Sequence, residues 1–137
     1  MSDALRRSCD AVPYPDKPRP ATHPDHLAAL ARLAGLNPAP ARRCRVLELG
    51  CAAGANLWPM AQYLPESEFV GVDFSPVQVE SGRRFVADLG LKNLTLKAAS
   101  ILDVDESWGT FDYVLCHGVF SWVPREVQEA ILTICAR

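Results

Sequence analysis

The sequence predicts an α/β fold, built as a doubly wound parallel sheet, and three observations lead to this prediction. Segments with strand-like and helix-like patterns alternate along the chain. Residues 44–49 are almost continuously apolar, which is typical of a parallel strand covered by helices on both faces. A loop of small residues, Gly50 to Gly54, follows this strand directly, as in strand–loop–helix units that bind nucleotides.

Two segments and a linker precede that strand. Residues 1–22 are predicted to form a proline-rich arm, because closely spaced prolines exclude a regular helix. Tyr14 in this arm is a candidate lid over a ligand, and a disordered tail is the alternative. A helix is predicted from Pro24, with leucines at helical spacing and Gly35 at its end, and residues 36–43 form the linker.

The segments after the loop complete the predicted sheet. Strands are expected over residues 68–72, 94–98 and 111–116, and helices over 55–64, 75–89 and 124–135. Ser75, Pro76 and Gln78 match the pattern of a capping box at the start of the second of these helices. This order of elements predicts a Rossmann-like sheet of four strands.

Size, charge and cysteine usage exclude several function classes. The chain has 137 residues, enough for one domain, and its formal net charge of −2 gives no indication of binding to nucleic acid or to a membrane surface. No apolar run approaches the roughly 20 residues that a membrane span needs. Five cysteines without a CxxC pair argue against disulfides and zinc, so we expect a cytoplasmic protein. His23 and His26 lack a third ligand, and no metal is expected.

The candidate site lies where the first two predicted strands end. Gly50 and Gly54 allow a sharp turn and close passage of the backbone, whereas Ala52 between them disfavours the close approach of a pyrophosphate. A plain tight turn is the alternative for this loop. Asp73 is expected to accept the two hydroxyl groups of a ribose, or else to cap the following helix. Glu48 is expected to brace the loop or to face the positive end of a ligand, with a solvent-facing position as the alternative.

These motifs resemble a known enzyme family. Residues 48–54, Glu-Leu-Gly-Cys-Ala-Ala-Gly, followed by Gly-Val-Asp-Phe-Ser at 71–75, are similar to class I S-adenosylmethionine-dependent methyltransferases, and residues 111–119 look like the fourth strand of that family. Residues 22–24, 56–61 and 117–124 further resemble bacterial methyltransferases that carry a methyltransferase regulatory domain. Some members of that group methylate protein lysines.

The resemblance implies S-adenosylmethionine as cofactor and assigns roles along this chain. The loop would hold the amino-acid end of the cofactor and Asp73 its ribose, and Phe74 would pack beside the adenine. Ser100 departs from the aspartate that is common at this position, so adenine recognition would use backbone groups or Asp103. The implied cofactor-binding residues are Glu48, Gly50, Cys51, Ala52, Gly54, Asn56, Asp73, Phe74, Ser100, Ile101, Cys116 and His117.

Residues after the fourth predicted strand are candidates for contact with the methyl acceptor. His117 would lie near the sulfonium and its methyl group, either as a catalytic base or in a structural role. Phe120 and Trp122 are expected either to line a substrate pocket or to pack the last helix against the sheet. The sequence does not identify the acceptor.

The resemblance also predicts an incomplete domain. Class I methyltransferases have a seven-stranded sheet, whereas residues 23–137 supply four strands and appear truncated after the fourth strand and its helix. The open edge of that strand would pair with a missing C-terminal part or by self-association. A NAD-dependent oxidoreductase and a non-catalytic interaction module are the alternative functions.

Overall fold

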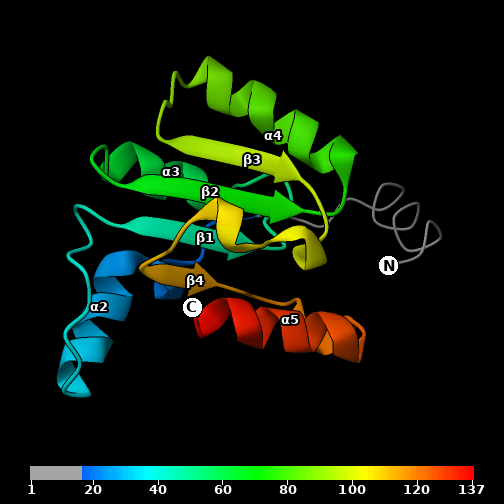
Figure 1. The fold of residues 1–137 in the computed structure, drawn as a ribbon. Coiled ribbons are helices and arrows are strands. Elements are labelled where there is room, and N and C mark those ends of the chain that lie inside the picture. Colours follow the sequence, from blue (N-terminus) through cyan, green and yellow to red (C-terminus); the bar gives the residue numbers. More distant parts are fainter. Residues whose placement is uncertain (1–16) are drawn as a thin grey trace.

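The computed structural model describes residues 17–137 and shows a four-stranded parallel sheet with helices on both faces (Figure 1). The strand order is β3-β2-β1-β4, which confirms the doubly wound, Rossmann-like fold. The strands are β1 (Arg45–Leu49), β2 (Glu68–Asp73), β3 (Leu94–Ala98) and β4 (Tyr113–Leu115). Tyr14 and the rest of the arm up to residue 16 lie outside the described residues.

Within residues 17–137, four α-helices and four single-turn 3-10 helices connect and cover the strands. The α-helices are α2 (Pro24–Leu33), α3 (Leu57–Tyr63), α4 (Pro76–Asp88) and α5 (Arg125–Cys135). The 3-10 helices are η1 (Pro20–Thr22), η2 (Ile101–Asp103), η3 (Glu106–Trp108) and η4 (Phe120–Trp122). The predicted strands and α-helices are confirmed, whereas the three-residue 3-10 turns were not predicted, because they are too short to show a periodic pattern.

Two apolar clusters hold the layers together, one on each face of the sheet. Alternate residues of a strand point to opposite faces, so Val46 and Phe69 pack beneath α2, α3 and α4, while Leu47 and Val70 pack beneath α5. All four of these side chains are at most 6% exposed. Burial on both faces explains why the first strand reads as a continuous apolar run.

Helix α4 begins differently from the predicted capping box. Ser75 is its N-cap, and the Ser75 hydroxyl accepts the N–H of Gln78 at 3.3 Å as expected. The reciprocal bond is made elsewhere, because the N–H of Ser75 is donated to Oδ1 of Asp73 at 2.9 Å. Asp73 therefore takes the role that the prediction gave to the Gln78 side chain.

Two glycines let the loop after β1 pack closely on its neighbours. A Cβ atom at Gly82, in the middle of α4, would lie 2.2 Å from the carbonyl oxygen of Ala53. A Cβ atom at Gly71 in β2 would lie 2.7 Å from Sγ of Cys51. The absence of both side chains brings α4 and β2 into direct contact with this loop.

Polar side chains fasten one end and one edge of the sheet. At the amino ends of the strands, the N–H of Arg45 donates to Oδ2 of Asp112 at 2.7 Å. At the outer edge of β3, Nε of Arg83 donates to the carbonyl oxygen of Leu96 at 2.9 Å. Strand β4 forms the opposite edge, as predicted. Between residues 17 and 137, no helix is long and apolar enough to cross a membrane.

Replacing Gly82 with alanine tests the contact between α4 and the loop. We expect Gly82→Ala to lower the free energy of unfolding by about 1–3 kcal/mol, because the new methyl group overlaps backbone that has little room to move. Urea unfolding of the chain measures this loss. Ser81→Ala is the matched control, since Ser81 is an exposed neighbour in α4. Equal stability of the two variants would show that the loop and α4 are not tightly packed.

Candidate functional site

The predicted site residues meet at one edge of the sheet, where the parallel strands end. Strands β2 and β3 lie on one side of β1 and β4 lies on the other, so the strand order reverses between β1 and β4. Ligands of open α/β sheets bind at such a switch point, outside the carboxyl ends of the strands. Gly50, Asp73, Ser100 and Cys116 all lie at or within two residues of a strand end.

The loop after β1 has an unusual backbone. Gly50, Ala52 and Gly54 have φ angles of +75°, +50° and +83°, so every second residue is in the left-handed region. Glycine adopts this region freely, while alanine does so at a cost. The N–H groups of Gly50 and Cys51 donate to the carbonyl oxygen of Val72 at 2.8 and 3.0 Å, which ties the loop to the end of β2. The expected need for glycine at both ends of the loop is therefore met.

Asp73 joins the loop to α4. Its Oδ2 accepts the N–H of Ala52 at 2.8 Å, and its Oδ1 accepts the N–H of Ser75. The capping alternative is thus realised, and a contact with the loop is added to it. The carboxylate is half-buried, and each of its oxygens has a second lone pair. Asp73 therefore keeps the capacity to accept hydroxyl groups from a ligand at this edge.

Glu48 braces the loop from below. It is 5% exposed, so the solvent-facing alternative is wrong, and its Oε1 accepts Nδ2 of Asn56 at 2.7 Å. Asn56 is 3% exposed, and its Nδ2 also donates to Oγ1 of Thr22 at 3.0 Å. Its Oδ1 accepts the backbone N–H of Arg19 at 2.7 Å. Both N–H groups of the Asn56 amide thus have partners within the protein.

At three further predicted positions, the side chain is either buried in the core or hydrogen-bonded within its own turn. Cys51 is 2% exposed and Ile101 is 7% exposed, and their side chains belong to the two apolar clusters. The hydroxyl of Ser100 accepts the N–H of Leu102, and the N–H of Ser100 donates to Oδ2 of Asp103 at 2.9 Å. Ser100 and Asp103 therefore form the capping box of η2. Phe74, a fourth predicted position, follows β2 directly and is half-buried.

The segment after β4 closes on the loop from the other side. His117 is exposed, Gly118 has a φ angle of +71°, and a Cβ atom at Gly50 would lie 2.3 Å from Cγ2 of Val119. Val119 therefore fills the space that the glycine leaves. Burial raises the pKa of the Cys116 thiol, and the Cys135 thiol raises it further. Cys116 thus stays protonated at neutral pH and does not act as a thiolate.

The aromatic residues of η4 face outward. Trp122 is 83% exposed and Phe120 is 41% exposed, so of the two alternatives the packing of α5 against the sheet is wrong for Trp122. The turn itself is fixed, because Nε2 of Gln128 donates to the carbonyl oxygen of Phe120 at 2.8 Å. The N–H of Trp122 donates to the carbonyl oxygen of Val119 at 2.9 Å. An ordered turn thus presents an exposed aromatic side chain.

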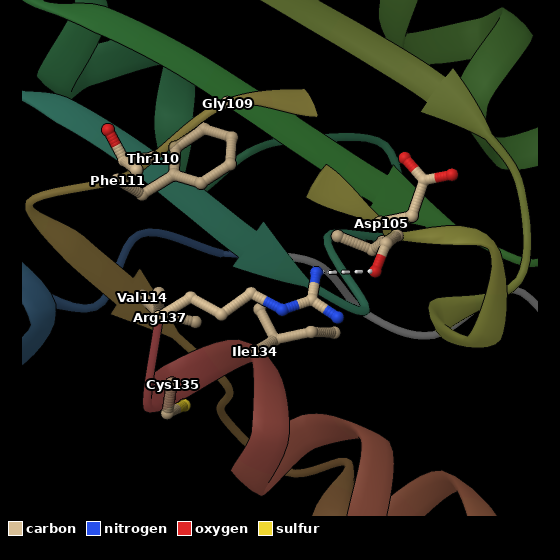
Figure 2. Close-up of a pocket in the computed structure, with 9 residues that line it drawn as sticks. Asp105, Gly109, Thr110, Phe111, Val114, Ile134, Cys135 and Arg137 are labelled. Carbon is tan, nitrogen blue, oxygen red and sulfur yellow. Dashed lines mark hydrogen bonds between the residues drawn. The ribbon is translucent and has the colours of Figure 1, made fainter. Parts of the chain in front are cut away.

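Two other features are not part of this site. Nδ1 of His23 accepts the N–H of Asp25 as the N-cap of α2, and residues 17–137 contain no group of three side chains suited to a metal ion. A hollow of about 30 Å³ lies at the end of α5, where Arg137 reaches the carbonyl oxygen of Val104 (Figure 2). It adjoins the segment before β4, away from the strand ends, and is far smaller than a nucleotide site.

Sequence reasoning missed four residues that shape the site. Arg19 and Thr22 contact Asn56, Val119 packs on Gly50, and Gly82 packs on Ala53. An isolated glycine inside a predicted helix is a signal of close packing, so Gly82 could have been found. The other three contacts join residues far apart in the sequence and leave no local pattern.

Comparisons with known proteins agree with this arrangement. A family model described as a methyltransferase domain matches residues 47–137. The uncharacterized protein RP028 of Rickettsia prowazekii is 47% identical over 93% of this chain, which spans about half (51%) of that protein. The release factor glutamine methyltransferase of Escherichia coli is 36% identical over 56% of this chain and 26% of its own length.

A solved structure is similar over almost the whole chain. PKMT2 from Rickettsia typhi, in complex with AdoHcy, superposes with a TM-score of 0.87 and 45% sequence identity over 90% of this chain and 24% of PKMT2. The match to the family model, over residues 47–137, contains the loop, Asp73 and the segment after β4. The match to the family model, the sequence identity and the shared fold together show that the chain belongs to the methyltransferase domain family, as a class I S-adenosylmethionine-dependent methyltransferase domain.

Proposed function

We propose that this chain is the cofactor-binding part of an S-adenosylmethionine-dependent methyltransferase that modifies a protein side chain. The bond between the Asp73 carboxylate and the N–H of Ala52 carries the proposal. It holds a carboxylate and a left-handed loop side by side at the switch point of the sheet. The AdoHcy complex of PKMT2, at 45% identity, supports the same ligand here. The division into an arm of residues 1–22 and a partial domain of residues 23–137 remains a prediction.

The residues at the strand ends fit this cofactor. In our assignment, the backbone of Gly50 to Gly54 takes the amino-acid end, and Asp73 accepts the ribose hydroxyls with its remaining lone pairs. Phe74, Ser100 and Ile101 adjoin the adenine, with Ile101 contributing its backbone since its side chain is buried. The positive φ angle of Ala52 already places a methyl group in the middle of the loop. This residue disfavours the pyrophosphate of NAD, which needs a closer approach.

Methyl transfer requires alignment and exclusion of water more than a dedicated acid. When bound, S-adenosylmethionine supplies an electrophilic methyl group on a positively charged sulfur. His117, exposed at the end of β4, is our candidate to accept the proton of the acceptor. Cys116 stays neutral beside it because burial raises the pKa of its thiol, so it does not compete as a nucleophile.

We propose a lysine side chain as the acceptor. The resemblance to methyltransferases with a regulatory domain favours it, because some of those enzymes methylate protein lysines. The exposed indole of Trp122 supports it physically, since the face of an aromatic ring attracts an ammonium group.

Titration of S-adenosylhomocysteine into the chain by calorimetry tests the cofactor site. We expect binding by the wild-type chain and an affinity about 10- to 100-fold lower for Asp73→Asn, because an amide offers one acceptor oxygen and no charge. Asp112→Asn is the matched control. Its carboxylate also accepts a strand N–H, that of Arg45, but at the opposite end of the sheet.

Three results would contradict the cofactor proposal. Binding of NAD in place of S-adenosylhomocysteine would favour the oxidoreductase. A folded wild-type chain that binds neither would favour the interaction module. Equal loss of affinity in Asp73→Asn and Asp112→Asn would show that the effect is one of stability and not of contact with the ligand.

Transfer of a labelled methyl group tests the acceptor. We expect the chain, given S-adenosylmethionine with a tritiated methyl group, to label a lysine-rich test protein but not the same protein after acetylation of its lysines. Trp122→Ala is expected to lower labelling by about two- to fivefold while leaving the affinity for S-adenosylhomocysteine unchanged, since a cation–π contact at an exposed site contributes about 0.5–1 kcal/mol. Equal labelling of the native and acetylated proteins would exclude lysine as the acceptor.

A further inference from the structure

A polar relay with two buried members, Glu48 and Asn56, joins the loop after β1 to the segment before α2. Its members are Glu48, Asn56, Thr22 and Arg19, and its bonds are 2.7 Å from Asn56 to Glu48, 3.0 Å from Asn56 to Thr22 and 2.7 Å from Arg19 to Asn56. The Thr22 hydroxyl also lies 2.9 Å from the carbonyl oxygen of Arg19, to which it can donate. The relay thus connects β1, the start of α3 and η1, which are separated along the chain.

The relay lies where its bonds hold the base of the loop in position. Glu48 lies two residues before Gly50, and Asn56 is the N-cap of α3 directly after the loop. The bond between Glu48 and Asn56 therefore closes the base of the loop. The same Asn56 amide accepts the backbone N–H of Arg19 through its oxygen. A shift of the loop would break bonds to the segment Arg19–Thr22, and a shift of that segment would disturb the loop.

The chemistry of the relay fixes the orientation of the Asn56 amide. The side-chain oxygen of Glu48 at 2.7 Å acts as an acceptor, so the nitrogen of the Asn56 amide must face it. The amide oxygen must then face the opposite way, where it accepts the N–H of Arg19. An aspartate at position 56 would keep the second bond, but it would place a second carboxylate against that of Glu48, so repulsion between like charges replaces the first bond. The two functions of this residue can therefore be separated by mutation.

We infer that Asn56 is a positioning residue, which makes the segment Arg19–Thr22 a structural part of the cofactor site. This inference rests on the proposed function, since it takes the loop to be the binding site for the amino-acid end of S-adenosylmethionine. A ligand that fixes the loop also fixes the segment through the shared amide of Asn56. By linkage, the order of that segment raises the affinity for the ligand by the same factor.

Hydrogen exchange with and without S-adenosylhomocysteine tests this coupling in the full 137-residue chain. In the wild type, we expect the ligand to slow exchange of the amides in residues 50–58 and also those of Arg19, Thr22 and His23. Asn56→Asp is expected to remove the protection of the second group and to lower affinity at least tenfold, roughly the loss of one buried hydrogen bond, because two carboxylates would also face each other in its place.

A double variant separates positioning from a general loss of stability. In Glu48→Gln/Asn56→Asp, the amide at position 48 can donate to the carboxylate at position 56, so the relay is rebuilt with its roles exchanged. We expect this variant to regain both the affinity and the protection of the segment. Thr22→Val leaves the bond between Glu48 and Asn56 intact and is expected to lower the protection of the segment alone.

Asn93→Asp is the matched control. Nδ2 of Asn93 donates to the carbonyl oxygens of Ala61, Leu64 and Ser67, at the amino end of β3 and away from the loop. We expect this substitution to lower the free energy of unfolding while the folded chain keeps its affinity and the ligand-dependent protection of the segment. Equal effects of Asn93→Asp and Asn56→Asp on protection would overturn the inference.

The outcomes distinguish failure of the inference from failure of the proposed function. No binding by the wild type would overturn both. Binding that protects residues 50–58 but not the segment Arg19–Thr22 would overturn the inference and leave the cofactor site standing. If Asn56→Asp leaves both the affinity and the protection of the segment Arg19–Thr22 unchanged, the inference is likewise overturned and the cofactor site still stands. If Asn56→Asp does not fold, Thr22→Val and the double variant decide between these outcomes.

Discussion

The carboxylate of Asp73 is the contact on which the rest of the site depends. It stands on the last residue of β2 and accepts one N–H from the loop after β1 and another from the start of α4. One side chain thus fixes the relative positions of three elements. The loop requires such a bond, because Ala52 sits in the left-handed region at a cost of about 1–2 kcal/mol for a residue with a Cβ atom.

The packing around the loop depends on glycines as much as on this bond, because their lack of a side chain lets neighbouring elements approach. Gly71 and Gly82 bring β2 and α4 against the loop, and Gly50 admits Val119 from the segment after β4. The loop is therefore enclosed on three sides by elements that approach its backbone directly. Its edge toward the carboxyl ends of the strands stays lined by backbone and by Asp73. A ligand there would meet a surface whose shape is set before it binds, which lowers the entropy cost of binding.

The order of elements and the main site positions could be predicted from the sequence because their signals are local. A proline after Ser75 marks the start of α4, apolar runs mark the strands, and a carboxylate at a strand end marks Asp73. The partners of buried polar groups could not be predicted in this way. Glu48 was recognised as a costly charge, but the bonds that Asn56 makes to Glu48 and Arg19 span 8 and 37 residues. The sequence also left two alternatives for Trp122, because a single 3-10 turn has no periodicity that would show which side is buried.

The bond from Arg83 to the carbonyl oxygen of Leu96 has a consequence for assembly of the sheet. Alternate residues of β3 turn their backbone groups away from β2, and these groups would otherwise offer a template to any extended chain. A strand that paired there would first have to displace the guanidinium, at a cost of about 1.5–3 kcal/mol for a hydrogen bond to a charged group. The arginine thus disfavours aggregation through this edge of the sheet.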